Sequence, residues 1–177
     1  PIYDGNVTSA NLISGLNWIS ANGVLPAVVN VSLNVPDSSG TVGTAVTNLI
    51  SAGFFVAASA GNDSNTFCAT APAKVSGVLT VAASDPYSDQ HAPYSNGGPC
   101  VGIYAPGVAT AASSGSNTSA GGFSGTSAAA PHVAGYAALL YENSGYIPTP
   151  AVMRNHIVIF SNSGIIGAPA GTTNRQL

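Results

Sequence analysis

A serine at the mouth of an alanine-rich stretch constrains this chain more than any other feature of its sequence. Ser127 follows Gly125-Thr126 and precedes a run of small and apolar residues that continues to Asn143. Apolar residues recur in this run at helical spacing, which predicts a helix over about residues 126–143. A serine on the first turn of a helix lies beside unpaired backbone N–H groups and the positive end of the helix dipole. Such a position suits the stabilisation of an oxygen that carries negative charge.

The rest of the chain alternates between apolar runs and amphipathic patterns. Further helices are predicted to begin at Thr8 or Ser9 and at Thr41, and a last helix is predicted from about Pro150 to Phe160. Pro131 is compatible with the serine-bearing helix if it lies in the first turns, where its missing N–H costs least. Unbroken apolar runs predict buried strands over residues 27–33, 54–58, 77–82 and 101–105. Continuous apolar strands that alternate with helices predict an α/β fold with a largely parallel sheet flanked by helices.

The composition excludes some classes of partner. Charged residues make up 5% of the 177 residues, and the formal net charge is −3. The only positive side chains are those of Lys74, Arg154 and Arg175. This balance argues against nucleic acid or an anionic membrane surface as a partner. Gly, Pro and polar residues interrupt every apolar run before it reaches the length of a membrane span, so no membrane partner is expected.

The stretch around the serine carries a specific resemblance. It reads Gly125-Thr126-Ser127-Ala128-Ala129-Ala130-Pro131-His132-Val133-Ala134-Gly135. This resembles the nucleophile motif of the subtilisin-like serine proteases, which usually has Met where Ala128 stands. The alternative is an ordinary buried helix that begins with a serine, and a lone Gly-Thr-Ser would favour that alternative. Because Pro131 and His132 also stand in register, the protease motif is the better interpretation.

Four further stretches match the same family in the same order. Val29–Leu33 resembles its substrate-binding strand, Ala58–Asn62 its oxyanion loop, and Tyr104–Gly107 the segment before the nucleophile. The tail Gly171–Leu177 resembles the end of the proteinase K branch. These matches cover only the later part of the family's catalytic domain. We therefore expect residues 1–177 to be the C-terminal part of a single subtilisin-like domain, with its N-terminal part missing from this chain.

The resemblance implies a role for two residues in the reaction. Ser127 would be the nucleophile, and its backbone N–H would be one donor to the oxyanion that attack on a peptide carbonyl generates. The side-chain amide of Asn62 would be the second donor. Alternatively, Asn62 is a turn residue before Asp63-Ser64, which is a common role for asparagine. Its place after an apolar strand and upstream of the serine motif favours the role in the reaction.

The resemblance also implies how a polypeptide substrate would bind. An extended peptide would pair with the strand edge at Ser32, Leu33 and Asn34. The pocket for the side chain before the cut bond would be walled by small, uncharged residues, which are Ala58, Ser59, Ala60 and Gly61. Such walls lead to the hypothesis of a broad preference for apolar or aromatic side chains. The family usually has Gly where Asn34 stands, and we expect the added side chain to narrow the rim of the pocket.

The general base is the open question in this sequence. A serine hydroxyl needs a histidine, and the histidine needs a carboxylate. In the family both lie in upstream motifs, and neither motif occurs here. Five residues along a helix turn through about 500° and rise about 7.5 Å, so His132 lies about 140° from the Ser127 face and cannot serve. His91 reads as a surface residue and His156 lies on the last predicted helix, so neither matches a family position.

Two functions from different classes follow. The first is a secreted, extracellular serine endopeptidase whose triad His and Asp belong to an N-terminal segment of the same domain, which this chain would need as a partner. The presence of both Ser127 and Asn62 favours it. The second is a secreted pseudo-protease or peptide-binding module, which the missing His and Asp favour. In either case we expect the chain alone to be inactive.

Three smaller expectations complete the interpretation. The chain has two cysteines, Cys68 and Cys100. This even number is compatible with one disulfide in a secreted protein or with two buried thiols. The resemblance implies the disulfide, and it also implies a cis peptide bond at Ala71-Pro72. Relatives in the proteinase K branch bind calcium near the positions of Ser76–Val78, with an aspartate where Gly102 stands. Because a hard cation usually needs anionic ligands, we expect no cofactor and no strong calcium site there.

Overall fold

A mainly parallel sheet forms the centre of the molecule. The computed structural model of the chain describes residues 8–108, 110–113, 120–164 and 166–177. Its seven-stranded sheet has the order β1-β3-β5-β7-β11-β10, and β6 pairs with β5. The four longest strands of this sheet run parallel, and they are β1 (Val28–Val31), β3 (Phe55–Ser59), β5 (Leu79–Asp85) and β7 (Val101–Pro106). The short strands are β11 (Arg175–Gln176), which is parallel to β7, and β10 (Asn162–Ser163) and β6 (Gln90–His91), which are antiparallel to their neighbours.

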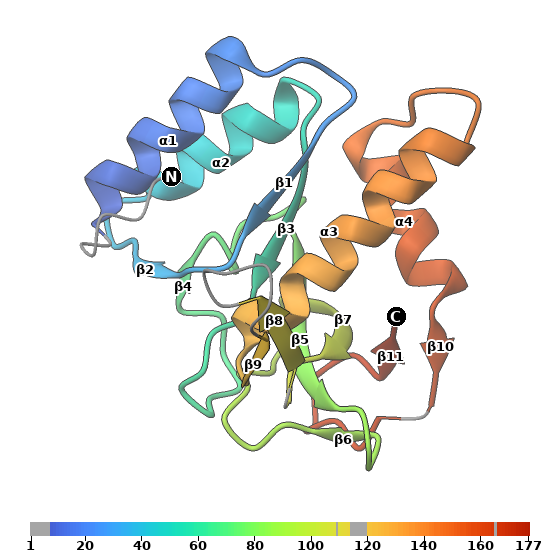
Figure 1. Cartoon of the computed structure of the whole chain (residues 1–177). Coiled ribbons are helices and arrows are strands. Elements are labelled where there is room, and N and C mark those ends of the chain that lie inside the picture. The colour runs from blue at the N-terminus through green and yellow to red at the C-terminus, as the bar shows by residue number, and fades with distance from the viewer. Residues whose placement is uncertain (1–7, 109, 114–119, 165) are drawn as a thin grey trace.

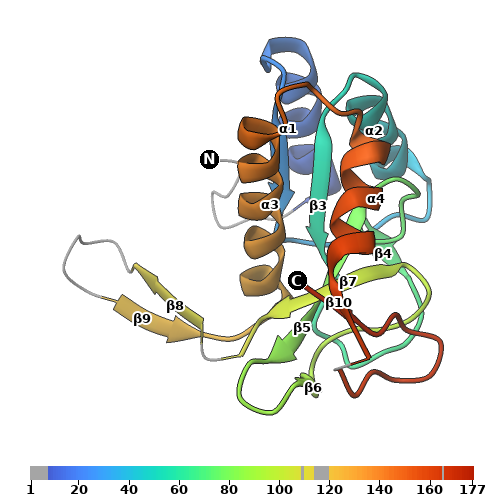
Figure 2. The ribbon, with the colours of Figure 1, turned by 90° about the vertical axis from the view of Figure 1, so that its right-hand side faces the viewer.

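Helices cover both faces of this sheet (Figures 1 and 2). One face packs against α1 (Ser9–Asn22) and α2 (Thr41–Ser51), and the other packs against α3 (Thr126–Asn143) and α4 (Pro150–Phe160). Alternate residues of β3 explain why both faces are apolar. Phe55 lies in the core cluster with α3 and α4, whereas Val56 lies in the cluster with α1 and α2. The predicted α/β fold with flanking helices is therefore confirmed.

The longer elements follow the sequence pattern closely. α3 and α4 have the predicted bounds, and Thr8 caps α1 by accepting a hydrogen bond from the Asn11 N–H at 3.2 Å. β1 is shorter than predicted because the chain leaves the sheet after Val31, so Ser32 and Leu33 lie beyond the strand. The short strands were not predicted, because two to four residues carry no readable alternation. The strands outside the main sheet are β2 (Val35–Pro36), β4 (Thr70–Ala71), β8 (Thr110–Ser113) and β9 (Ala120–Phe123). The β8–β9 hairpin projects from the body of the molecule in Figure 2.

A buried aspartate fixes the segment between β2 and α2. The side-chain oxygens of Asp37 accept hydrogen bonds from the N–H groups of Val42 at 3.1 Å and Gly43 at 2.9 Å, at the start of α2. Lys74 donates to the Asp37 carbonyl at 2.7 Å. Burial alone raises the pKa of the Asp37 carboxyl, but these N–H donors and the Lys74 charge outweigh burial and hold the pKa below its ordinary value. The chain that leaves β1 is thus anchored within a few residues.

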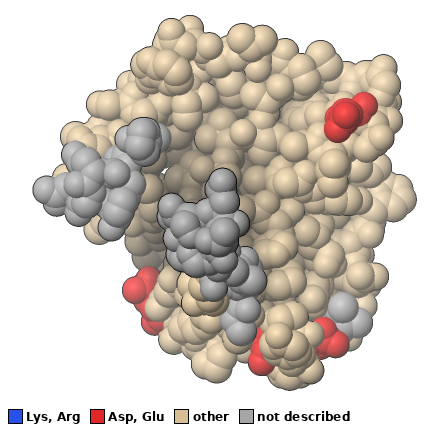
Figure 3. Space-filling view, in the orientation of Figure 1, with Lys and Arg blue, Asp and Glu red and all other residues tan. Residues whose placement is uncertain are grey.

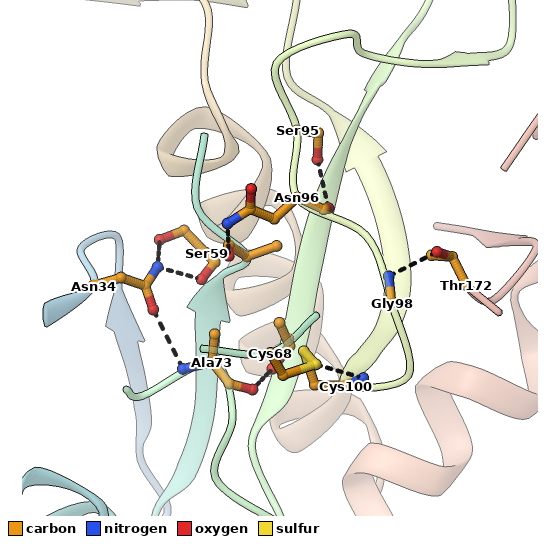
Figure 4. The surroundings of a disulfide bond; sticks show 11 residues. Asn34, Ser59, Cys68, Ala73, Ser95, Asn96, Gly98, Cys100 and Thr172 are labelled. Carbon is orange, nitrogen blue, oxygen red and sulfur yellow. Dashed lines mark hydrogen bonds between the residues drawn. A yellow bond between two sulfur atoms is a disulfide. The ribbon is translucent and has the colours of Figure 1, made fainter. Parts of the chain in front are cut away.

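Two local expectations are confirmed. Cys68 and Cys100 form a disulfide, which joins the loop after β3 to the start of β7 (Figure 4). The Ala71-Pro72 bond is cis, and so is Leu25-Pro26, which was not predicted. Among the described residues, no helix combines the length and the apolar character needed to cross a membrane.

Candidate active site

Ser127 is the second residue of α3, and that helix begins at the carboxyl ends of the central strands. Gly125 caps the helix, and its N–H donates to the Gly107 carbonyl at 2.8 Å, just after β7. The phenol of Tyr94 also donates to the Gly107 carbonyl. Burial raises the pKa of Tyr94, so its hydroxyl remains a donor at neutral pH. These contacts fix where the mouth of α3 lies relative to the sheet.

Pro131 plays a different part from the one expected. It is the sixth residue of α3, one turn beyond the orphan N–H groups, so the residue that loses a helical hydrogen bond is Ser127, four positions earlier. The Ser127 carbonyl accepts instead from the Ser32 hydroxyl at 3.0 Å. Pro131 thus lies within the first turns of α3, but its missing N–H leaves the Ser127 carbonyl to find a partner outside the helix. The proline frees a carbonyl that ties the helix to the segment after β1.

The Ser127 hydroxyl completes a reciprocal pair with Ser32. Ser127 Oγ donates to the Ser32 carbonyl at 2.8 Å, while Ser32 Oγ donates to the Ser127 carbonyl. The nucleophile candidate thus lies directly against the predicted substrate-binding segment. A carbonyl cannot take up a proton, so this contact positions the hydroxyl without activating it.

Asn62 lies at the same helix mouth. Its Oδ1 accepts from both the backbone N–H and the hydroxyl of Thr126, each at 2.9 Å. The Thr126 hydroxyl in turn accepts from the Gly61 N–H at 3.1 Å. Because Oδ1 faces Thr126, the Nδ2 group at the other side of the carboxamide points its two N–H donors away from Thr126. A neutral donor next to Ser127 is what a transient oxyanion requires.

Sequence reasoning missed the residue that holds the Asn62 loop. Asn96 is buried, and its Oδ1 accepts from the N–H groups of Asp63 at 2.9 Å and Asn65 at 3.2 Å. Its Nδ2 donates to the Ala60 carbonyl at 3.0 Å (Figure 4). Its backbone N–H donates to the Gly61 carbonyl at 2.9 Å. Gly61 has a φ of +101°, and a Cβ there would collide with Asn96 Nδ2. In the sequence Asn96 stands before Gly97-Gly98 and reads as a turn residue, so no local signal points to this role.

The predicted pocket walls lie at different depths. Ser59 and Ala60 are buried at the end of β3 and beyond it, and Gly61 is half-buried. Ala58 lies within β3, and its side chain belongs to the core cluster shared with α1 and α2. Leu33 packs partly against that same cluster. The Asn34 side chain is held between Ser59 and Ala73: it donates to the Ser59 carbonyl and hydroxyl and accepts from the Ala73 N–H.

The three histidines are engaged away from Ser127. His132 Nδ1 lies 2.9 Å from the Ala128 carbonyl, so that nitrogen carries the proton. His91 Nδ1 lies 3.0 Å from the hydroxyl of buried Tyr104; burial lowers the pKa of His91 and raises the pKa of Tyr104 to about 12. The His156 ring packs against the Phe160 ring at a tilt of 41°, with 4.5 Å between the ring centroids. Within the described residues, Ser127 Oγ therefore bonds a carbonyl and not a base.

The calcium position suggested by the resemblance holds an arginine. Arg154 Nε donates to the Val78 carbonyl at 3.4 Å. A Cβ built on Gly102 would lie 3.5 Å from the Nη2 of Arg154. No cluster of three His, Cys, Asp or Glu residues that could hold a metal ion occurs in the part of the chain that the structure describes. A hard cation needs oxygen ligands, and this position offers a positively charged guanidinium in place of a carboxylate.

Comparison with known protein families matches residues 3–173 to the subtilase family, peptidase family S8. The chain belongs to this family. The match spans the Ser127 motif, the Asn62 loop and the disulfide, so one family pattern accounts for the helix mouth and for the segments gathered around it.

Serine proteinases resemble this subtilase over nearly its whole length. It is 37% identical to an extracellular serine proteinase of Thermus sp. (strain Rt41A), over 92% of this chain and 39% of the relative. It is 38% identical to the subtilisin-like serine protease Pen c 1 of Penicillium citrinum, over 98% of this chain and 44% of the relative. The crystal structure of a cold-adapted subtilisin-like serine proteinase matches with a TM-score of 0.90 at 35% identity, over 98% of this chain and 62% of that chain. The fold is therefore subtilisin-like, and the chain spans about two fifths of the curated relatives' length.

We predict that Asn96 acts on catalysis by positioning Asn62. In the protein expressed with the upstream segment expected from the sequence, Asn96→Ala should lower kcat for a peptide substrate about 10- to 100-fold, because small misplacements of a catalytic group have effects of this size. If Asn96 works through Asn62, the same substitution should have no further effect on kcat in an Asn62→Ala background. Steady-state kinetics of the four proteins measure this coupling.

Thr172→Ala is the matched control for Asn96→Ala. The Thr172 hydroxyl accepts from the Gly98 N–H at 2.7 Å, on the same segment but away from the Asn62 loop (Figure 4). Its loss should lower stability and leave kcat unchanged. Equal losses of kcat from Asn96→Ala in both backgrounds would show that Asn96 acts independently of Asn62.

Proposed function

We propose that this chain carries the nucleophile and the oxyanion hole of a secreted serine endopeptidase that hydrolyses peptide bonds. The observation that carries the proposal is the joint placement of Ser127 and Asn62 at the mouth of α3. Ser127 Oγ bonds the Ser32 carbonyl, and Asn62 Oδ1 is held by Thr126, the residue next to the serine. Family membership and the serine proteinase relatives support the same reaction class.

The chemistry assigned to these residues is acyl transfer. Ser127 Oγ attacks the peptide carbonyl while a base removes its proton, and the carbonyl oxygen becomes an oxyanion. The Ser127 N–H and Asn62 Nδ2 donate hydrogen bonds to that oxygen, and they are worth most when the charge is fully formed. Collapse of the tetrahedral intermediate expels the amine with a proton from the base, and water then hydrolyses the acyl-enzyme.

We propose that the base and its carboxylate come from an upstream segment of the same domain. β1 is an end strand of the sheet and pairs only with β3 among the described residues. Beside it lies an open groove, which is lined by Pro26, Ala27, Val28, Ala138, Tyr141 and Glu142. An unpaired strand edge next to an apolar groove is a surface that another strand can complete. The segment that completes it would also bring the histidine to Ser127.

The substrate is proposed to be an extended polypeptide recognised mainly through its backbone. The segment Ser32–Asn34 leaves the sheet beside Ser127, so its backbone groups can pair with a bound peptide. The described residues on the face in Figure 3 show scattered acidic side chains and neither Lys nor Arg. Neutral backbone recognition is consistent with such a surface. The disulfide and the extracellular relative support secretion.

A second candidate is a pseudo-protease that binds peptides without cutting them. The observation that favours it is the contact of Ser127 Oγ with a carbonyl in place of a base. A binding module would keep the peptide-pairing segment and have no need of the hydrogen bonds by which Thr126 orients the Asn62 side chain. The presence of those hydrogen bonds makes the endopeptidase the better proposal.

Covalent labelling distinguishes the two candidates. We predict that a fluorophosphonate, which reacts with activated serines, labels Ser127 in the protein expressed with its upstream segment and leaves residues 1–177 alone unlabelled. The reason is that a serine hydroxyl without a base is a weak nucleophile at neutral pH. Peptide mapping by mass spectrometry locates the label, and Ser127→Ala is the control. Absence of labelling in both proteins would favour the pseudo-protease, and labelling of the folded fragment would reveal a base within the chain.

We also propose that Arg154 takes the place of a calcium ion at the start of β5. Its guanidinium supplies a positive charge to the Val78 carbonyl without any metal. Calcium should therefore stabilise the natural chain little at this site. The double variant Gly102→Asp/Arg154→Ala supplies a carboxylate and removes the competing cation. The new Cβ at position 102 would lie 2.6 Å from Leu79 Cδ1, so the end of the Leu79 side chain has to shift.

We predict that calcium raises the Tm of this double variant more than that of the natural chain. An ion present at about 1,000 times its Kd adds about 4 kcal/mol to the free energy of unfolding, which is enough for a shift of several degrees. Thermal unfolding with calcium and with a chelator measures both proteins. Equal calcium-dependent shifts would contradict the role given to Arg154.

A further inference from the structure

One side chain crosses the crevice at the carboxyl ends of β1 and β3. The two parallel strands pair up to Val31 and Ala58. Beyond that pair the chain continues as residues 32–34 on one side and as residues 59–61 on the other. In open parallel sheets the ligand crevice lies outside the carboxyl ends of the strands. The Ser127 hydroxyl donates to the Ser32 carbonyl and therefore lies at the same end of the sheet.

Asn34 spans this crevice with its carboxamide. Nδ2 donates to the Ser59 carbonyl at 2.7 Å and to the Ser59 hydroxyl at 3.1 Å. Oδ1 accepts from the Ala73 N–H at 3.3 Å. Figure 4 shows the Asn34 side chain between Ser59 and Ala73, which belong to two different segments. The side chain thus fills the space between three stretches of backbone and does not stand at their rim.

The partners of Asn34 are themselves fixed. Ser59 is buried at the end of β3, and Ala73 is buried in the turn after β4. The Ala73 carbonyl accepts from the buried Thr80 hydroxyl at 2.7 Å. A carboxamide that swung out of the crevice would give up its bonds to Ser59 and Ala73 and leave polar groups of buried residues without a partner. Asn34 is therefore held as a wall and does not act as a movable rim.

The position of the wall determines which part of a substrate meets it. A peptide carbonyl bound between Ser127 Oγ and Asn62 Nδ2 carries its own side chain next to those two groups. The space there lies between residues 32–34 and residues 59–61, because Ser32 touches Ser127 and Asn62 follows Gly61. That side chain therefore points toward Asn34.

We infer that Asn34 determines the specificity of this subsite and restricts the side chain before the cut bond to small residues such as Gly, Ala and Ser. The inference rests on the proposed function and narrows its substrate class. It replaces the broad apolar or aromatic preference that the small walls alone suggest. The Asn34 carboxamide crosses the space between residues 32–34 and the end of β3, where it bonds the Ser59 carbonyl and hydroxyl.

Peptide hydrolysis by the protein with its upstream segment tests the inference. The substrates are matched peptides that carry Ala, Leu or Phe before the cut bond, and kcat/KM is measured for each. The natural chain should prefer Ala over Phe. In Asn34→Ala and Asn34→Gly the Phe/Ala ratio of kcat/KM should rise at least about 10-fold, because a difference of one methylene in an apolar pocket already changes selectivity by about 10- to 200-fold.

Asn30→Ala is the matched control. Asn30 lies on β1, four positions before Asn34, is exposed, and donates to the Ser32 hydroxyl at 2.9 Å. It should leave the Phe/Ala ratio unchanged. A natural chain that prefers Phe or Leu overturns the inference even if the Asn34 variants do not fold, and so does an unchanged ratio in folded Asn34→Ala. If no peptide is hydrolysed and the fluorophosphonate labels no serine, the proposed function is overturned and the inference that rests on it falls too. A failure of the inference alone leaves hydrolysis and labelling in place, so the two failures can be told apart.

Discussion

The two hydrogen bonds from Thr126 to the side-chain oxygen Oδ1 of Asn62 hold together the two segments on which the proposed chemistry depends. One segment is the mouth of α3, which carries Ser127, and the other is the loop that follows β3. If the Asn62 side chain were rotated so that its Nδ2 faced Thr126, that group would meet the Thr126 N–H, which is also a donor, and the proposed oxyanion donor would be lost. The backbone N–H of Thr126 fixes the orientation of the amide, because a backbone N–H can only donate. The proposed site thus depends on a residue that never touches the substrate.

Neutral amides do in this molecule what ion pairs do elsewhere. Asn62 meets the helix mouth, Asn96 holds the loop behind it, and Asn34 ties the segment after β1 to β3. Each offers a donor and an acceptor on one rigid plane, so a single side chain can satisfy two backbone segments at once. In a chain with 5% charged residues, this is a route to a rigid polar site without buried charge. It also leaves the crevice free of fields that would compete with a developing oxyanion.

How far the sequence predicts this structure depends on the range of each interaction. The bounds of α3 and α4 follow from long periodic segments, and the central strands follow from apolar runs buried on both faces. The strands β10 and β11 could not be predicted, because two-residue strands exist only through their partners. Ser127 and Asn62 lie in motifs that can be read locally. The contacts of Asn34 and Asn96 could not be predicted, because their partners lie 25 to 39 residues away along the chain. The consequence of Pro131 was missed for the same reason, since the freed carbonyl is used by Ser32, 95 residues away.

The central claim is that Asn62 binds an oxyanion at Ser127 and not the peptide as such. The most direct test is the affinity of a peptide boronic acid, which forms a tetrahedral adduct with the serine, compared with that of an uncleaved product peptide. Removal of one such donor costs about 10²–10³ in kcat in subtilisin itself, and that established case sets the expected size. In the protein with its upstream segment, Asn62→Ala should raise the Ki of the boronic acid by about this factor and leave the Kd of the product peptide nearly unchanged. An equal change in both constants, or no change in either, would contradict the account.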